Sequence, residues 1–150
     1  MYLNKHWILE EVEKMFSEFG ADAINPYNVI KSSDIDLIET ELGNKTLGQT
    51  IRNKRCYAIL INQSLSSSMK EFILWHEIAH VRLHKGISTA AFRTNNLNHM
   101  IYGIEAEANA FAIAMLIKKI DECDLTHMSS FQIIEYLGLP HTLEHLVLHH

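Results

Sequence analysis

The sequence lacks the features that mark membrane, fibrous and disordered proteins. Its longest uninterrupted apolar run, Ala110 to Ile117, has eight residues, whereas a membrane-spanning helix needs about 20. Glycine and proline are scarce, with six and two copies, which excludes a collagen and argues against a disordered chain. Because 47% of the 150 residues are nevertheless apolar, we expect a single globular domain over residues 1–150.

Basic charge and cysteine are also in short supply. The 13 Lys and Arg face 18 Asp and Glu, for a net charge of −5, so we expect no broad basic face for nucleic acid or an anionic membrane. From Ile120 to His150 there is no Lys or Arg at all, which argues against DNA binding by the C-terminal segment. The two cysteines, Cys56 and Cys123, are expected to stay free, and the absence of an apolar leader predicts a cytoplasmic protein.

Apolar spacing and turn residues predict a mixture of helices and strands. We expect an N-terminal helical part (1–24), a core (25–120) and a helical tail (121–150). The expected strands are about 35–39, 47–52 and 55–61, with a turn at Asn53 and Lys54, and the last strand is apolar enough to be covered on both faces. The expected helices are 5–19, a short turn from Pro26, a central helix from the serines at 66–68 to Leu83, 100–119, 129–137 and 141–148. The intervening loop, 87–98, is long enough to carry function.

The central helix carries the pattern His76-Glu77-Ile78-Ala79-His80. Residues four apart stand one above the other on a helix, so both imidazoles can reach one ion, and Glu77 sits beside them, displaced by about 100°. Two histidines and a carboxylate at this spacing are typical of zinc hydrolases. We therefore predict His76 and His80 as ligands of one Zn²⁺ per chain and Glu77 as a general base.

The alternative is a surface helix that carries these residues by chance. Apolar residues weigh against it, because Phe72, Ile73 and Leu83 share the histidine side and others cover most of the remaining surface. A buried pair of imidazoles beside a carboxylate is costly unless a partner such as a divalent metal satisfies them. Two imidazoles and a carboxylate would also accept manganese or iron.

A catalytic zinc site needs a third protein ligand, and the next helix offers two carboxylates. Glu105 and Glu107 lie on different sides of that helix, so only one is expected to face the histidines. Bulky apolar residues flank Glu107, and small alanines nearby would let two helices approach closely. On these grounds we predict Glu107 as the third ligand, although a solvated Glu107 stays an alternative.

The segments HEIAHVRLH and EAEANAFAIAML together resemble the ImmA/IrrE family of prokaryotic zinc metallopeptidases over about residues 25–140. The resemblance implies an α+β, zincin-like fold with a small three-stranded sheet packed against the HExxH helix and further helices. Position by position, His76 and His80 match the zinc histidines of the family, Glu77 its catalytic glutamate and Glu107 its third ligand. The Leu-Met-Pro that usually follows in the family is replaced here by Met115-Leu-Ile-Lys.

Three further residues have possible supporting roles. His99 and Tyr102 begin the helix that carries Glu107, so they are candidates to stabilise an oxyanion, or else ordinary polar residues at a helix entrance. His84 follows His80 by one turn and matches a family histidine, and we predict an indirect or packing role because the metal would lie too far from His76. The stripe of His141, His145 and His149 lacks the matching glutamate, which predicts a solvated face.

The resemblance also implies a function. Members of the family are associated with phages and mobile elements and with cleavage of a helix-turn-helix repressor, so we expect a site-specific endopeptidase with a protein substrate. An extended substrate would add to an exposed edge of the strands within 35–61. Two alternatives stay open: a non-catalytic zinc module that binds a repressor or antitoxin without cutting it, and a hydrolase of small amides.

Overall fold

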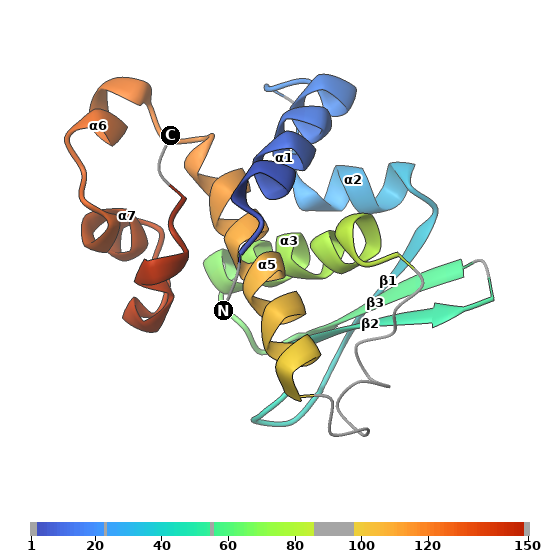
Figure 1. Ribbon diagram of the computed structural model, residues 1–150. Coiled ribbons are helices and arrows are strands. Elements are labelled where there is room, and N and C mark those ends of the chain that lie inside the picture. The colour runs from blue at the N-terminus through green and yellow to red at the C-terminus, as the bar shows by residue number, and fades with distance from the viewer. Residues whose placement is uncertain (1–2, 23, 55, 86–97, 149–150) are drawn as a thin grey trace.

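The protein is an α+β fold in which helices cover one face of a small sheet (Figure 1). The computed structural model describes residues 3–22, 24–54, 56–85 and 98–148, the side chains of 98–102 excepted. Within this part of the chain the strands are β1 (Ile35–Thr40), β2 (Gly48–Asn53) and β3 (Cys56–Asn62). The helices are α1 (Lys5–Phe19), α2 (Pro26–Ser32), α3 (Ser67–Leu83), α5 (Asn98–Ile117), α6 (Glu122–Thr126), α7 (Ser130–Tyr136) and the 3-10 helix η1 (His141–Leu146).

The sheet has the order β1-β3-β2, with β1 parallel and β2 antiparallel to the central strand β3. Strand residues alternate between two faces, and Ile35, Ile59 and Ile61 on one face are buried in the core. On the other face Ile38 is 46% exposed and Ile51 is 36% exposed. The expectation that β3 is covered on both faces is therefore wrong, because the described helices pack on one face only.

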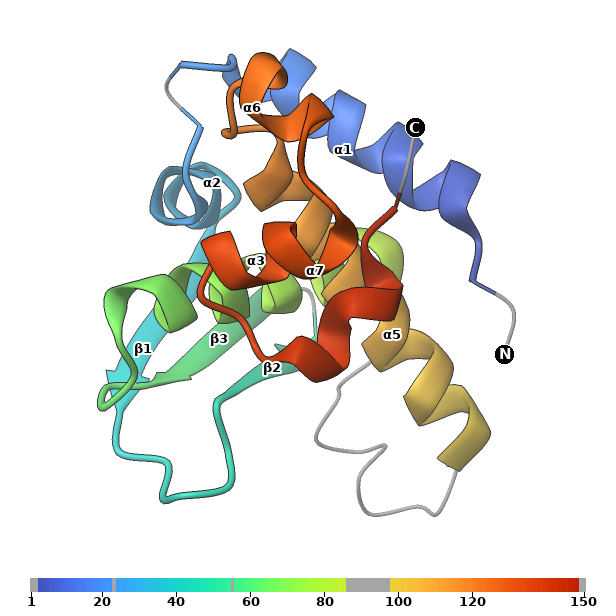
Figure 2. The same ribbon diagram turned by 90° about the vertical axis from the view of Figure 1, so that its left-hand side faces the viewer.

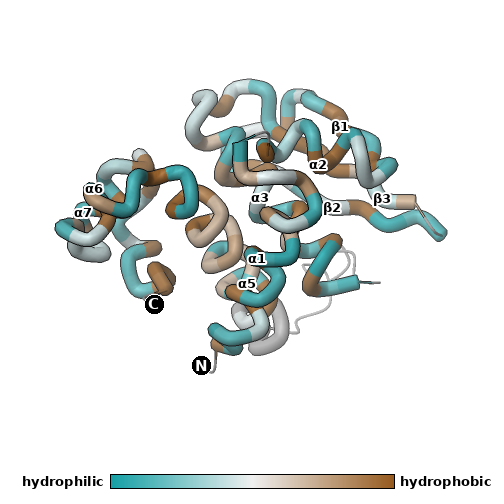
Figure 3. The backbone as a smooth tube through the Cα atoms, turned by 90° about the horizontal axis from the view of Figure 1, so that it is seen from above, coloured by the Kyte–Doolittle hydropathy of each residue, from teal (hydrophilic) through white to brown (hydrophobic). Residues whose placement is uncertain are grey.

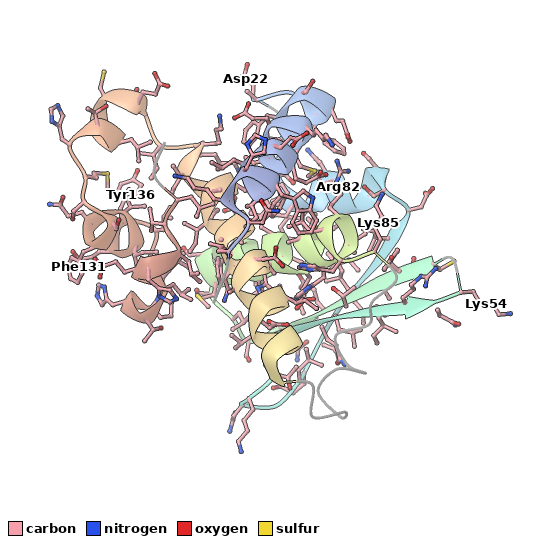
Figure 4. All side chains as sticks on the ribbon, in the orientation of Figure 1. Asp22, Lys54, Arg82, Lys85, Phe131 and Tyr136 are labelled. Carbon is pink, nitrogen blue, oxygen red and sulfur yellow. The ribbon has the colours of Figure 1, made fainter. Side chains whose placement is uncertain are left out.

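The hairpin that joins β2 and β3 forms one residue later than expected. Asn53 pairs with Cys56 in the ladder, so Asn53 belongs to the strand and the turn begins at Lys54, whose φ of 58° is left-handed. Lys54 stands at the projecting tip of the hairpin (Figure 4), and the tip is hydrophilic (Figure 3). The strands themselves lie where the sequence placed them, within one residue at most ends.

Two helices form the centre of the molecule. α3 packs on β2, on β3 and most extensively on α5. The stretch of α5 from Ala110 to Ile117 is buried on every side, because α1 and η1 also contact it. α1 contributes the apolar stripe Ile8, Val12 and Met15 to the same core, as its helical spacing predicts.

α1 is also held to the end of α3 by charge. The guanidinium of Arg82 donates to Glu11 at 2.9 Å and to Glu18 at 2.9 Å, both on α1. These contacts fix the C-terminal end of α3, which carries the histidines, against the N-terminal helix.

The C-terminal elements α6, α7 and η1 lie on the side of α5 away from the hairpin tip (Figures 1 and 2). The sequence did not predict α6, and residues 141–148 form a 3-10 helix ending at Leu146 rather than an α-helix. α7 is confirmed, and it begins with a capping box in which Ser129 and Gln132 cap each other's backbone. None of the described helices is long and apolar enough to cross a membrane.

Candidate metal centre

α3 brings two histidine rings to one point. Ser66 caps the helix, because its side chain accepts a hydrogen bond from the backbone of Met69, as is usual for a serine at an N-cap. Four residues separate His76 from His80, so their rings project from the same face, and the two Nε2 atoms lie 3.1 Å apart.

The third group at this point is Glu105 of α5. Its carboxylate lies 2.9 Å from Nε2 of His76 and 3.3 Å from Nε2 of His80. The ligand atoms of these three residues all lie within 4.8 Å of one another, and no other cluster of this kind occurs in the described part of the chain. Two buried imidazoles and a half-buried carboxylate therefore converge on a single position.

This donor set fits a zinc ion. Ligand atoms held about 2.0–2.1 Å from a tetrahedral zinc lie about 3.3 Å from each other, close to the 2.9–3.3 Å measured among these three residues. Three protein ligands of the types His, His and Glu leave a fourth position open, which is the pattern of catalytic rather than structural zinc. The spacing of the ligand atoms of His76, His80 and Glu105 is therefore that of a zinc site.

Asn109 orients one of the histidines. It lies four residues after Glu105, on the same face of α5, and its Oδ1 accepts a hydrogen bond of 2.7 Å from Nδ1 of His76. Because an amide oxygen can only accept, this contact places the proton on Nδ1 and directs Nε2 toward Glu105. An outer contact of this type fixes the ring and its tautomer at metal sites.

The electrostatics of the cluster agree with its geometry. Burial disfavours the charged form of Glu105, but its hydrogen bonds with His76 and His80 outweigh this effect and hold the pKa of Glu105 well below its usual range. Burial also disfavours the charged form of His76 and so lowers its pKa. The contact with Glu105 more than compensates, and the pKa of His76 is raised. The cluster thus favours a carboxylate anion beside a protonated imidazole, and a metal ion would supply that positive charge in place of the proton.

Glu107 does not join this cluster. Its carboxylate lies 3.3 Å from Nε2 of His84, and burial raises the pKa of Glu107. The structure therefore corrects the choice of the third carboxylate made from the sequence: Glu105 faces the histidine pair and Glu107 faces the next histidine along α3. The physical reason is that α3 crosses α5 on the side that carries Glu105 and Asn109.

His84 links Glu107 to the histidine pair. Its Nδ1 lies 3.0 Å from Nδ1 of His80, so a continuous row of polar contacts runs from Glu107 through His84 to His80. Burial, followed by the neighbouring His80, lowers the pKa of His84 to about 4. A neutral His84 can hold the Nδ1 atom of His80, which leaves the Nε2 atom of His80 free to face Glu105.

Glu77 lies beside the histidines and is 2% exposed. Thr50 of β2 holds it, because the Thr50 hydroxyl lies 2.5 Å from Oε2 of Glu77 and donates to it. The start of the same strand approaches closely as well: a Cβ on Gly48 would lie 3.3 Å from Oε1 of Glu77 and only 2.6 Å from Cγ2 of Ile73. The strand therefore fixes the carboxylate. Sequence reasoning weighed Glu105 and chose Glu107 instead, and it missed Asn109 and Thr50.

The other residues predicted from the sequence either lie outside the described part of the chain or lie away from the cluster. The side chains of His99 and Tyr102 and most of the loop 87–98 lie outside the described residues, so their oxyanion and functional roles stay predictions. His141 and His145 are exposed on η1, and the ring of His141 stacks on Phe131 with centroids 4.4 Å apart.

Comparison with known proteins gives two findings. The model of the M78 peptidase family, described as the IrrE N-terminal-like domain, matches residues 30–150. The chain is also 28% identical over 124 residues to "Uncharacterized immunity region protein 2" of Bacillus phage phi105, and the match covers 81% of this chain and 78% of the phage protein. The region that the family model matches, residues 30–150, includes the whole sheet, α3 and α5.

Proposed function

Because the chain belongs to the M78 peptidase family, the IrrE N-terminal-like domain, we propose that it is a zinc-dependent endopeptidase. The family is one of zinc metallopeptidases with a zincin-like α+β fold, and the fold predicted from the sequence is confirmed. The finer proposal is that this chain cuts a helix-turn-helix repressor of a phage or mobile element at a specific site.

The observation that carries the proposal is the convergence of His76, His80 and Glu105 with Glu77 held beside them. A structural zinc site has four protein ligands and no use for an unligated carboxylate next to the ion. Here three donors converge, and a second carboxylate, that of Glu77, is held by Thr50 instead. This division of roles supports a hydrolytic site.

The reaction would use the residues as follows. A zinc ion, when bound, supplies Lewis-acid polarisation of a peptide carbonyl and lowers the pKa of water. Glu77 accepts the proton of the attacking water and then donates it to the amine that leaves. Asn109 holds His76, and His84 holds His80, so that both Nε2 atoms keep their direction. Thr50 keeps the carboxylate of Glu77 beside the reacting group.

The proposed substrate class rests on the phage relative. That protein is named for an immunity region of a phage, which agrees with the association of the family with helix-turn-helix repressors that the resemblance implies. A protein substrate also suits the position of β2, which is an edge strand among the described strands and runs past Glu77. An extended peptide can pair with such an edge through its backbone.

The test is to incubate the zinc-loaded protein with repressors encoded beside its gene and to compare Glu77→Gln. Cleavage at one site by the wild type, none by Glu77→Gln, and equal zinc content in both proteins are expected. If the wild type binds a repressor tightly and leaves it intact, the chain is a non-catalytic regulatory module. If it cuts short peptides but no folded or flexible protein, the substrate class is small amides.

A further inference from the structure

A cavity of about 310 Å³ opens directly from the cluster of His76, Glu77, Glu105 and Asn109. Apart from Lys45, Gly48 and Thr142, the remaining lining is apolar, and it comes from α3, from the segment that leads into β2 and from η1 with the proline before it. The apolar lining residues are Leu47, Met69, Phe72, Ile73, Pro140 and Leu143. At about 30 Å³ for each water of the liquid, the cavity has room for a large side chain.

One face of α3 forms the floor of the cavity. Met69, Phe72, Ile73 and His76 are spaced three, four and seven residues apart, so they share one side of the helix. The apolar part therefore begins one helical turn, about 5.4 Å, before the histidine pair. Phe72 is 3% exposed and Ile73 is 5% exposed, so the floor is rigidly packed.

The two walls are built by segments far apart in the sequence. Leu47 ends the loop between β1 and β2, and the side chain of Asn62 anchors this loop by donating to the carbonyls of Gly43 at 2.8 Å and Thr46 at 3.1 Å. The other wall is Pro140 and the η1 turn with Leu143, which lies against α5 (Figure 2). The C-terminal tail thus helps to form the cavity rather than only capping the core.

We propose that this cavity is the specificity pocket of the protease and that it receives a large apolar side chain, such as Leu, Met or Phe, next to the bond that is cut. The inference rests on the proposed function. A charged side chain would lose its hydration against the apolar floor, and Lys45, a cation in the lining, is itself exposed to solvent. A very small side chain would gain little van der Waals contact there. η1 is then a determinant of substrate choice.

The test uses two zinc-chelating peptide hydroxamates that differ at one position, one with an isobutyl side chain and one with hydrogen. Calorimetry on the full-length, zinc-loaded protein measures the dissociation constant of each. We expect the isobutyl probe to bind about 10-fold to 100-fold more tightly, which is the range for apolar groups that fill a pocket.

Two variants test whether the preference for the isobutyl probe arises in this cavity. Thr142 lines the cavity from an exposed position, so Thr142→Phe fills it without disturbing the core and should remove the preference. Tyr136 is 69% exposed on α7, outside the cavity, and Figure 4 labels it there. Tyr136→Ser is the matched control in the same tail and should keep the preference.

The outcomes separate the two proposals. Equal zinc-dependent binding of both probes, or a preference that survives in Thr142→Phe, would overturn the pocket and leave the metal site standing. If neither hydroxamate binds the zinc-loaded protein, the proposed function fails and the pocket assignment fails with it.

Discussion

The hydrogen bond between Thr50 and Glu77 can be measured without knowing the substrate. Thr50→Val keeps the shape of the side chain and removes the hydroxyl that donates to the carboxylate. Thr50 is fully buried and Glu77 is 2% exposed, so solvent cannot replace the lost donor. A hydrogen bond to a charged group contributes about 1.5–3 kcal/mol, and we expect a coupling free energy of this size between the two residues.

The assay is a double-mutant cycle on the metal-free protein, with the free energy of unfolding in urea measured for the wild type, Thr50→Val, Glu77→Leu and the double variant. Thr50→Ser keeps the hydroxyl and is the matched control, with a cost from the lost methyl only. Once a cleaved substrate is identified, Thr50→Val in the zinc-loaded protein should lower kcat by about 10-fold or more with zinc content unchanged. A coupling below about 0.5 kcal/mol would refute the role of Thr50.

Three further predictions concern stability. Gly48→Ala places a Cβ 2.6 Å from Cγ2 of Ile73, so it should cost about 1–3 kcal/mol in the free energy of unfolding; an unchanged urea midpoint would contradict the packing. Arg82→Ala releases α3 from α1 and should cost about 1 kcal/mol, less at high salt; the same loss at low and high salt would contradict it. In the metal-free protein, Glu105 has a lowered pKa and stabilises the fold above its unfolded value of about 4.3, whereas His76 has a raised pKa and stabilises it below about 6.5. Unfolding free energies should therefore be higher near pH 5.5 than at pH 4 or pH 8, and this pH dependence should flatten in Glu105→Gln.

Local signals were enough to predict most of the fold. Helical spacing in α1 and the alternation and turn residues around β2 and β3 reflect short-range physics that a sequence displays directly. The cover of β3 was mispredicted because an apolar run does not show which face another layer occupies. The 3-10 geometry of η1 was missed because the spacing of its apolar residues is compatible with either helix type.

The site residues also divide into those that local sequence predicts and those that depend on tertiary packing. His76, Glu77 and His80 come from one helix, and their mutual geometry follows from the helical repeat alone. The choice between Glu105 and Glu107 depends on how α5 is rotated against α3, and α5 is apolar around most of its circumference, so its polar face is narrow. Asn109 carried the usable signal, because a polar residue four positions after Glu105 marks a second polar group on that face. Thr50 gave none, since its contact with Glu77 spans 27 residues.

The most direct test of the proposed metal centre is the zinc affinity of two matched variants, Glu105→Gln and Glu107→Gln, measured by competition with a chelator at pH 7. Both replace a glutamate of the same helix, but only Glu105 faces the histidine pair. We predict that Glu105→Gln weakens zinc binding by more than about 100-fold, whereas Glu107→Gln, which acts through His84, weakens it by less than about 10-fold. Equal losses, or a larger loss in Glu107→Gln, would contradict the assignment of Glu105 as the third ligand.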